Sequence, residues 1–170
     1  MDISKATAVF VSIKTANAFS SILELSYAVV RLSDKKIVEE AEIRTTVEYP
    51  EILAKGVNPN VVMKGLYSEK EAVTILMNAT ADKDIVICWN LFHLRNVLAK
   101  YGIFVQVGFD VSAKIGSPCG AKTLSELCAL LGIVEVDAGT AHGDLLSIYD
   151  IYCKYGNTSK DRLKSISLKR

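Results

Sequence analysis

Short apolar runs and amphipathic stretches alternate along the chain. Residues 8–13 and 84–89 are mostly apolar, which is typical of strands buried on both faces of a sheet. Residues 22–31 and 36–46 favour two more strands, joined by a turn at 33–35. The second of these alternates between polar and apolar positions, so one of its faces is expected to meet solvent. The pattern predicts an antiparallel three-stranded beginning.

Capping residues mark the beginnings of the predicted helices. Ser68 and Thr123 are each followed three residues later by a glutamate, the capping-box pattern. Asn90 is placed to cap a helix over 91–101, a short strand is expected at 104–109, and helical spacing predicts a last helix over about 142–155. The predicted order βββ-α-β-α-β-α-α favours the α/β class, with an RNase H-like mixed sheet flanked by helices.

Composition and charge narrow the class of protein. The chain has 170 residues, 50% of them hydrophobic, which suits one globular domain, and no apolar run reaches the roughly 18–20 residues of a membrane span. Residues 157–170 hold five basic side chains and one acid, a charge of +4, whereas residues 1–156 hold 15 basic and 18 acidic side chains, a charge of −3. The basic segment indicates a polyanionic partner or a solubilising terminus.

The cysteines and the beginning of the chain bear on its compartment. The four cysteines form no C-x-x-C pair, and a chain this apolar needs no disulfides to fold. Asp2 and Lys14 argue against a secretory signal. We therefore expect reduced thiols and an intracellular protein, cytoplasmic or nuclear, without a membrane partner.

Five sequence blocks in order carry a resemblance to a known family. The chain resembles the DEDDh 3′→5′ exonucleases of the proofreading type over roughly residues 6–156. The blocks are Val9–Ile13, Ile22–Val29, Ile85–His93, Thr123–Ile133 and Ala141–Ser147. The resemblance implies an exonuclease-like domain over residues 1–156, followed by a basic C-terminal tail over 157–170.

The resemblance also implies a site, from which this chain departs. Members of the family hold two divalent metal ions with four carboxylates and use a histidine as general base, a chemistry suited to in-line displacement at phosphorus. His142 matches the histidine. The four carboxylate positions are occupied by Lys14, Ala16, His93 and Ser147.

This departure predicts that the chain is not an enzyme but a pseudo-exonuclease, with no catalytic residues, metal or cofactor. The expected function is a protein-interaction or scaffold module in a nucleic-acid-handling complex. The expected partners are protein subunits, a second copy of the chain, and DNA or RNA bound weakly. Contacts to nucleic acid are expected from Lys14, Trp89, His93, Arg95, Lys160, Arg162 and Lys164. Trp89 and Phe92 are interpreted first as packing residues, with base stacking as the alternative.

Two alternatives keep the fold and change the site. In the first, Glu24, Asp110 and Asp144 rebuild an acidic site for a metal-dependent exonuclease, although hydrogen-bonded or solvated acids are the simpler interpretation. In the second, zinc stabilises a nucleic-acid-binding relative. Its ligands would be Cys88, His93 and His142, joined by Cys119 or Cys153.

Overall fold

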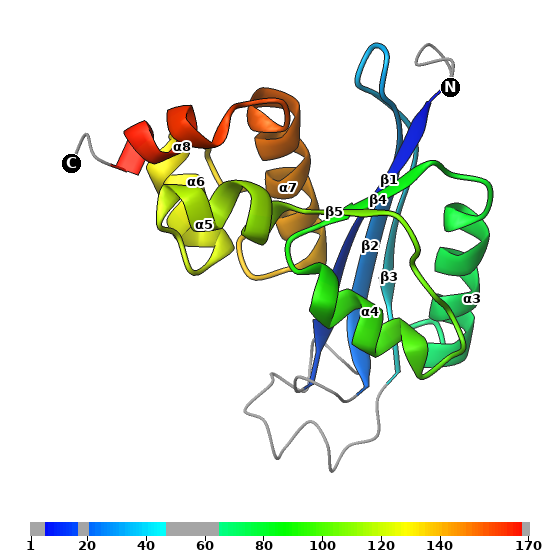
Figure 1. Cartoon of the computed structure of the whole chain (residues 1–170). Helices are drawn as coiled ribbons and strands as arrows, with labels where there is room; N and C mark the ends of the chain where they lie inside the picture. Colours follow the sequence, from blue (N-terminus) through cyan, green and yellow to red (C-terminus); the bar gives the residue numbers. More distant parts are fainter. Residues whose placement is uncertain (1–5, 17–20, 47–64, 168–170) are drawn as a thin grey trace.

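Five strands form one mixed sheet in the order β3-β2-β1-β4-β5 (Figure 1). The computed structural model describes residues 6–16, 21–46 and 65–167. The first three strands pair antiparallel, whereas β4 joins β1 and β5 joins β4 in parallel. The strands are β1 Thr7–Thr15, β2 Ile22–Arg31, β3 Lys36–Arg44, β4 Ile85–Cys88 and β5 Gly108–Asp110.

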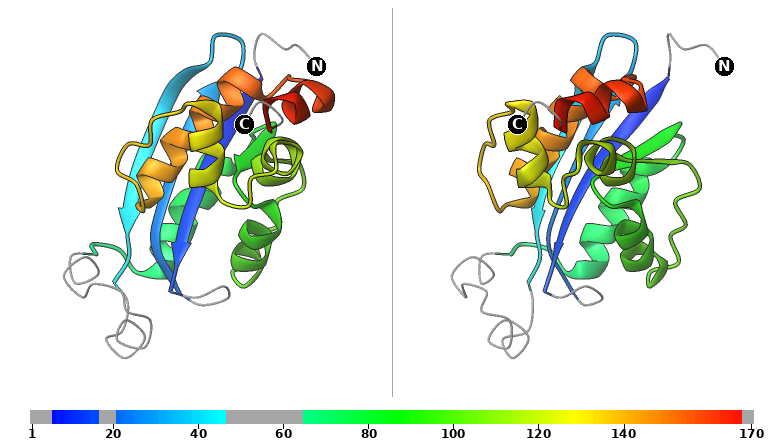
Figure 2. Two further views of the ribbon diagram at one scale, coloured as in Figure 1. Left: turned by 90° about the vertical axis from the view of Figure 1, so that its left-hand side faces the viewer. Right: turned by 60° about the vertical axis from the view of Figure 1, so that its left-hand side comes forward.

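Helices cover both faces of this sheet (Figure 2). Two of them lie on one face, α3 Glu69–Thr80 and α4 Leu91–Ala99. The other face is covered by α7 Ala141–Tyr155, and beside it lie a π-helical turn Ser112–Gly116, α5 Ser117–Cys119, α6 Leu124–Leu131 and α8 Lys160–Ser167. The expected fold class, an RNase H-like mixed sheet flanked by helices, is confirmed.

Alternation along β1 divides the core into two clusters. Ala8 and Phe10 face α7, while Val9 and Val11 face α3 and α4, as period-2 side chains require. Phe10 is fully buried, and its ring meets the rings of Tyr149 and Tyr152 edge-on, each at 5.4 Å between centroids. The central strand thus holds both helical layers on the sheet.

The strand expected at 104–109 is shorter than predicted, since β5 covers only Gly108–Asp110. The carbonyls of Val105 and Gln106 accept hydrogen bonds of 3.0 Å from the Arg95 guanidinium. These bonds direct the two carbonyls toward the Arg95 side chain of α4. The segment therefore runs along α4 before it enters the sheet.

The basic segment after residue 156 contains a packed helix, α8. Leu163 of α8 is 1% exposed, and its carbonyl accepts a hydrogen bond of 3.6 Å from the Cys119 thiol. The division of the chain at residue 156 stays a prediction, and the last basic residues, Lys169 and Arg170, lie outside the described residues. None of the described helices is long and apolar enough to cross a membrane.

Candidate functional site

A pocket opens at the carboxyl end of β4, between β1 and α4. Parallel strands such as β1 and β4 bring their carboxyl ends to one edge of the sheet, where α/β proteins usually bind ligands. The polar residues and the tryptophan that line this pocket are Ser12, Cys88, Trp89, Asn90, His93 and Asp144. This pocket is the candidate site.

An ion pair joins β1 to α7 beside the pocket. The Lys14 ammonium donates a hydrogen bond of 2.6 Å to a carboxylate oxygen of Asp144. The Lys14 side chain is 33% exposed and that of Asp144 is 26% exposed, so the pair is in contact with solvent. Among the described residues that line the pocket, Asp144 is the one carboxylate, and its charge is balanced by Lys14.

The N-terminus of α4 brings His93 to the same pocket. The Asn90 side chain caps the helix by accepting a hydrogen bond of 2.9 Å from the His93 amide. Asp110 accepts hydrogen bonds of 3.0 Å from the amides of Leu91 and Ala113, so this carboxylate ties α4 to the π-helical turn. Asp110 acts here as a structural cap.

The aromatic residues around this helix have two different environments. Trp89 packs over Gly116, where an added Cβ atom would lie 3.0 Å from the indole ring, in agreement with its interpretation as a packing residue. Phe92 is 72% exposed, so its assignment to the core is wrong. Helical spacing alone did not show that Phe92 lies on the outer face of α4.

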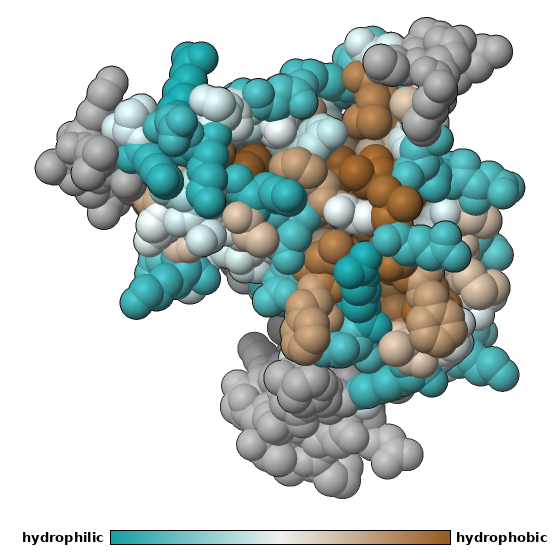
Figure 3. Space-filling model, in the orientation of Figure 1, coloured by the Kyte–Doolittle hydropathy of each residue, from teal (hydrophilic) through white to brown (hydrophobic). Residues whose placement is uncertain are grey.

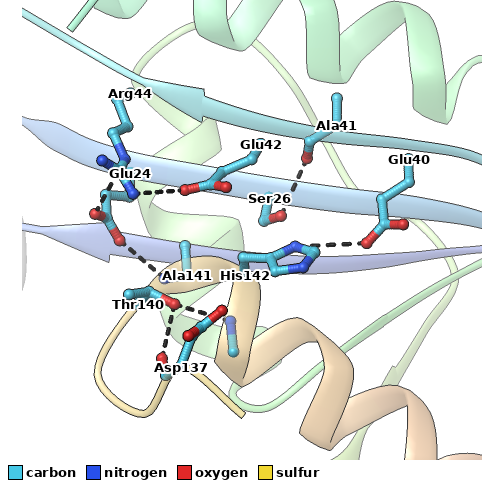
Figure 4. Close-up of polar contacts among 11 residues, drawn as sticks. Glu24, Ser26, Glu40, Ala41, Glu42, Arg44, Asp137, Thr140, Ala141 and His142 are labelled. Atoms are coloured by element: carbon cyan, nitrogen blue, oxygen red, sulfur yellow. Dashed lines mark hydrogen bonds and ion pairs between the residues drawn. The ribbon is translucent and has the colours of Figure 1, made fainter. Parts of the chain in front are cut away.

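Of the five positions aligned with the family's site, His93 lines this pocket, Lys14 lies beside it through its contact with Asp144, and the other three lie elsewhere. Ala16 follows the end of β1 and donates its amide to the Ser21 carbonyl, whereas the β1 residues that line the pocket are Val11, Ser12 and Ile13. His142 faces β3, with its Nδ1 atom 3.4 Å from a Glu40 oxygen (Figure 4). Ser147 is buried against the Cys128 thiol.

The acids proposed to rebuild a metal site have separate structural partners. One Glu24 oxygen accepts a hydrogen bond of 2.9 Å from the Ala141 amide, and the other lies 3.7 Å from the Arg44 guanidinium (Figure 4). Asp110 caps α4, and Asp144 binds Lys14. The structure therefore does not assemble these three carboxylates into one site.

The proposed zinc ligands are also separated. Burial, with a smaller contribution from Asp110, raises the pKa of the Cys88 thiol to about 12, so its metal-binding thiolate is strongly disfavoured. Cys119 contacts α8, and Cys153 is on α7 beside Tyr149. In the described part of the chain, no three His, Cys, Asp or Glu side chains come close enough to hold a metal ion.

A pair of divalent cations does not fit the described pocket either. Mg²⁺ requires several oxygen ligands, usually including carboxylates, and the one carboxylate among the described lining residues already binds an ammonium.

The remaining predicted nucleic-acid contacts are divided between two places. Arg95 is on α4, whereas Lys160, Arg162 and Lys164 are on α8, at the other end of the helical layers (Figures 1 and 2).

Comparison with solved structures shows an exonuclease-like fold. Escherichia coli Exonuclease I in complex with a dT13 oligonucleotide matches 95% of the chain with a TM-score of 0.73 and 13% identity. Its complex with dA16 matches with a TM-score of 0.68 at 13% identity, and the ExoI/SSB-Ct complex with 0.62 at 11%, each over 95% of the chain. The chain spans 43%, 42% and 43% of the matched chains in these three structures. No family model and no curated protein matches the sequence.

These neighbours correct one prediction. The expectation that the chain is not an enzyme is contradicted, because the matched structures are of an exonuclease, one of them with product bound. The chain is only 13% or 14% identical to these exonuclease structures. At this identity, the substitution of four aligned acids does not demonstrate that the chain is inactive.

Proposed function

We propose that this chain is a DEDDh-related, exonuclease-like domain that binds nucleic acid, and that Lys14 contacts a backbone phosphate at the pocket. The observation that carries the proposal is the 2.6 Å contact between Lys14 and Asp144. This contact holds an ammonium group beside a pocket that also presents Asn90 and His93. Lysine binds phosphate as a point charge, and amide and imidazole groups add hydrogen bonds.

The charge balance of the pocket supports phosphate as the ligand. Asp144 is paired, so the pocket offers an incoming phosphate one cation and no unpaired carboxylate among its described lining residues. Phosphate and Asp144 would compete for the same ammonium group. The exonuclease complexes with dT13 and dA16 support a nucleic acid as the source of that phosphate.

A protein partner is the second candidate. Val134 and Val136, between α6 and α7, are 84% and 51% exposed, which is unusual for neighbouring apolar side chains. The ExoI/SSB-Ct complex supports protein partners for this fold in general. A scaffold role with protein subunits or with a second copy of the chain stays a prediction.

Anisotropy titrations of dye-labelled single-stranded DNA and RNA test the proposal, with each oligonucleotide titrated in EDTA and in Mg²⁺. Asp144→Asn frees the ammonium from its carboxylate and should tighten binding several-fold in both buffers. Lys14→Gln should weaken binding and lower the slope of log affinity against log salt by about 0.7, the contribution of one single-strand phosphate. Lys70→Gln, an equal charge change at an exposed position on α3, is the matched control.

The direction of the Asp144→Asn effect decides the outcome. Weaker binding, confined to the Mg²⁺ buffer, would mean that Asp144 is a cation ligand, and the proposal would be overturned. The double variant Lys14→Gln/Asp144→Asn keeps the pair neutral and separates loss of binding from loss of folding, which circular dichroism checks. A nuclease assay on the same preparations measures cleavage independently of this binding.

A further inference from the structure

An exposed surface beside the pocket combines two aromatic rings with a cation. We define the α4 strip as Phe92, Arg95, Phe104 and Val107. Phe104 is 77% exposed and Val107 is 59% exposed, and Phe92 is nearly as exposed as Phe104. Apolar side chains this large are usually covered in a folded protein unless they meet a ligand.

Hydrogen bonds hold the strip together as one surface. Phe92 and Arg95 lie three residues apart on α4 and therefore share a face of the helix. The two bonds from Arg95 to the carbonyls of residues 105 and 106 hold the following segment along α4. Gly108 continues this contact, since a Cβ atom there would lie 2.7 Å from the Leu91 side chain. Figure 3 shows hydrophobic and hydrophilic side chains together over α4 and this segment.

Residues 90–109 carry a positive formal charge, whereas residues 1–156 as a whole carry a negative one. Residues 90–109 contain no Asp or Glu, and they hold two basic side chains, Arg95 and Lys100. Residues 1–156 as a whole carry −3. The stretch itself therefore carries a formal charge of +2, which favours a polyanion, although Asp110 accepts a hydrogen bond from its Leu91 amide.

We propose that the α4 strip binds the unpaired bases of a single-stranded nucleic acid. The bases stack on Phe92 and Phe104. Arg95, which joins α4 to residues 104–107, is the cation next to these rings. This inference rests on the proposed function, because the strip continues from His93, which lines the phosphate pocket. Bases in a duplex are already stacked on one another and are not available to these rings, so the strip selects single strands.

The test compares Phe92→Ala and Phe104→Ala with the wild-type chain. The probes are labelled oligo-dT, oligo-U, a duplex of the same length, and an abasic oligonucleotide that has the phosphates without the bases. Each variant should lose about 5-fold or more in affinity for oligo-dT and oligo-U, and should bind the abasic strand unchanged. Both side chains are exposed, so their removal should leave the melting temperature unchanged. Val134→Ala, an exposed apolar residue elsewhere, is the control.

The outcomes separate this inference from the proposed function. If Phe92→Ala and Phe104→Ala bind oligo-dT with unchanged affinity, the proposal that the α4 strip binds bases is overturned, even if Lys14→Gln still weakens binding. A Lys14→Gln chain that binds the abasic strand normally overturns the phosphate contact, even if the strip variants lose affinity. Full binding by Phe92→Leu shows that a ring is not needed and overturns stacking. A wild-type dimer that dissociates in Phe92→Ala, measured by sedimentation, identifies the strip as a contact between copies and also overturns it.

Discussion

A carboxylate oxygen of Glu24 accepts a hydrogen bond of 2.9 Å from the amide of Ala141, which joins β2 to the first residue of α7 across 117 positions of sequence. Because this bond is buried and its acceptor is charged, Glu24→Ala should lower the free energy of unfolding by about 2–3 kcal/mol. Urea denaturation measures the change. Glu42→Ala, which removes an exposed ion pair with Arg44, should cost less than about 1 kcal/mol. A stable Glu24→Ala chain with altered cation binding would assign Glu24 to a metal site instead.

Asp110 connects two elements through its two oxygens. Asp110→Ala leaves the amides of Leu91 and Ala113 without their acceptor, and we expect a loss of roughly 2 kcal/mol. Asp110→Asn retains one acceptor oxygen and should lose about half as much. Thermal unfolding followed by circular dichroism gives both values. Equal stability of the three chains would show that the carboxylate does not hold α4.

The packing of α8 makes deletion of the basic segment a poor test of its charges. Leu163→Ala should lower the free energy of unfolding by about 2–4 kcal/mol, because a buried leucine is lost from the contact with α5. Lys160→Gln/Arg162→Gln removes charge from exposed positions of the same helix and should leave stability within about 0.5 kcal/mol. Nucleic-acid binding by this double variant, at two salt concentrations, then reports the charges alone. A Leu163→Ala chain as stable as the wild type would contradict the observed packing.

Cys88 should make the protein less stable at alkaline pH. In the unfolded chain its thiol loses the proton near its ordinary pKa of 9.0, whereas in the folded chain the pKa is about 12. Between these values the unfolded state binds fewer protons, so the free energy of unfolding falls as the pH rises, by roughly 1.4 kcal/mol per unit. Between pH 9 and pH 10 this thiol should lower the free energy of unfolding by about 1 kcal/mol, because it is only half deprotonated in the unfolded chain at pH 9, and urea denaturation measures the change. The slope should be smaller in Cys88→Ala, and an identical slope would exclude the thiol as its source.

Most of the fold followed from local patterns in the sequence. Both capping boxes form, with the Ser68 and Thr123 side chains accepting from the amides of Glu71 and Glu126, and the apolar runs become β1 and β4. The helix α8 was not predicted, because its composition is mainly polar and only tertiary packing buries Leu163. Tertiary hydrogen bonds from Arg95 likewise shortened β5.

The site was harder to predict, because small shifts of register turn side chains to other faces. On α7, His142 and Asp144 are two positions apart, which corresponds to a rotation of about 200°. His142 therefore faces β3, while Asp144 reaches Lys14. On β1, the register of pairing with β2 shifts between Lys14 and Thr15, and Ala16, which follows this shift, does not line the pocket, whereas Ser12, which precedes it, does. A sequence alignment shows neither the rotation along α7 nor the register shift on β1.

The edge strand β3 exposes Glu39, Glu40 and Glu42, while the acid-free stretch over α4 follows β4 at the other side of the sheet. Separated charges of opposite sign give the folded chain an electric dipole moment across its sheet. Near a polyanion the exposed acids of β3 would be repelled, so the edge of the sheet that β3 forms would turn away before contact. The distribution of charge over the fold would thus orient the molecule near such a partner, although its net charge is only +1.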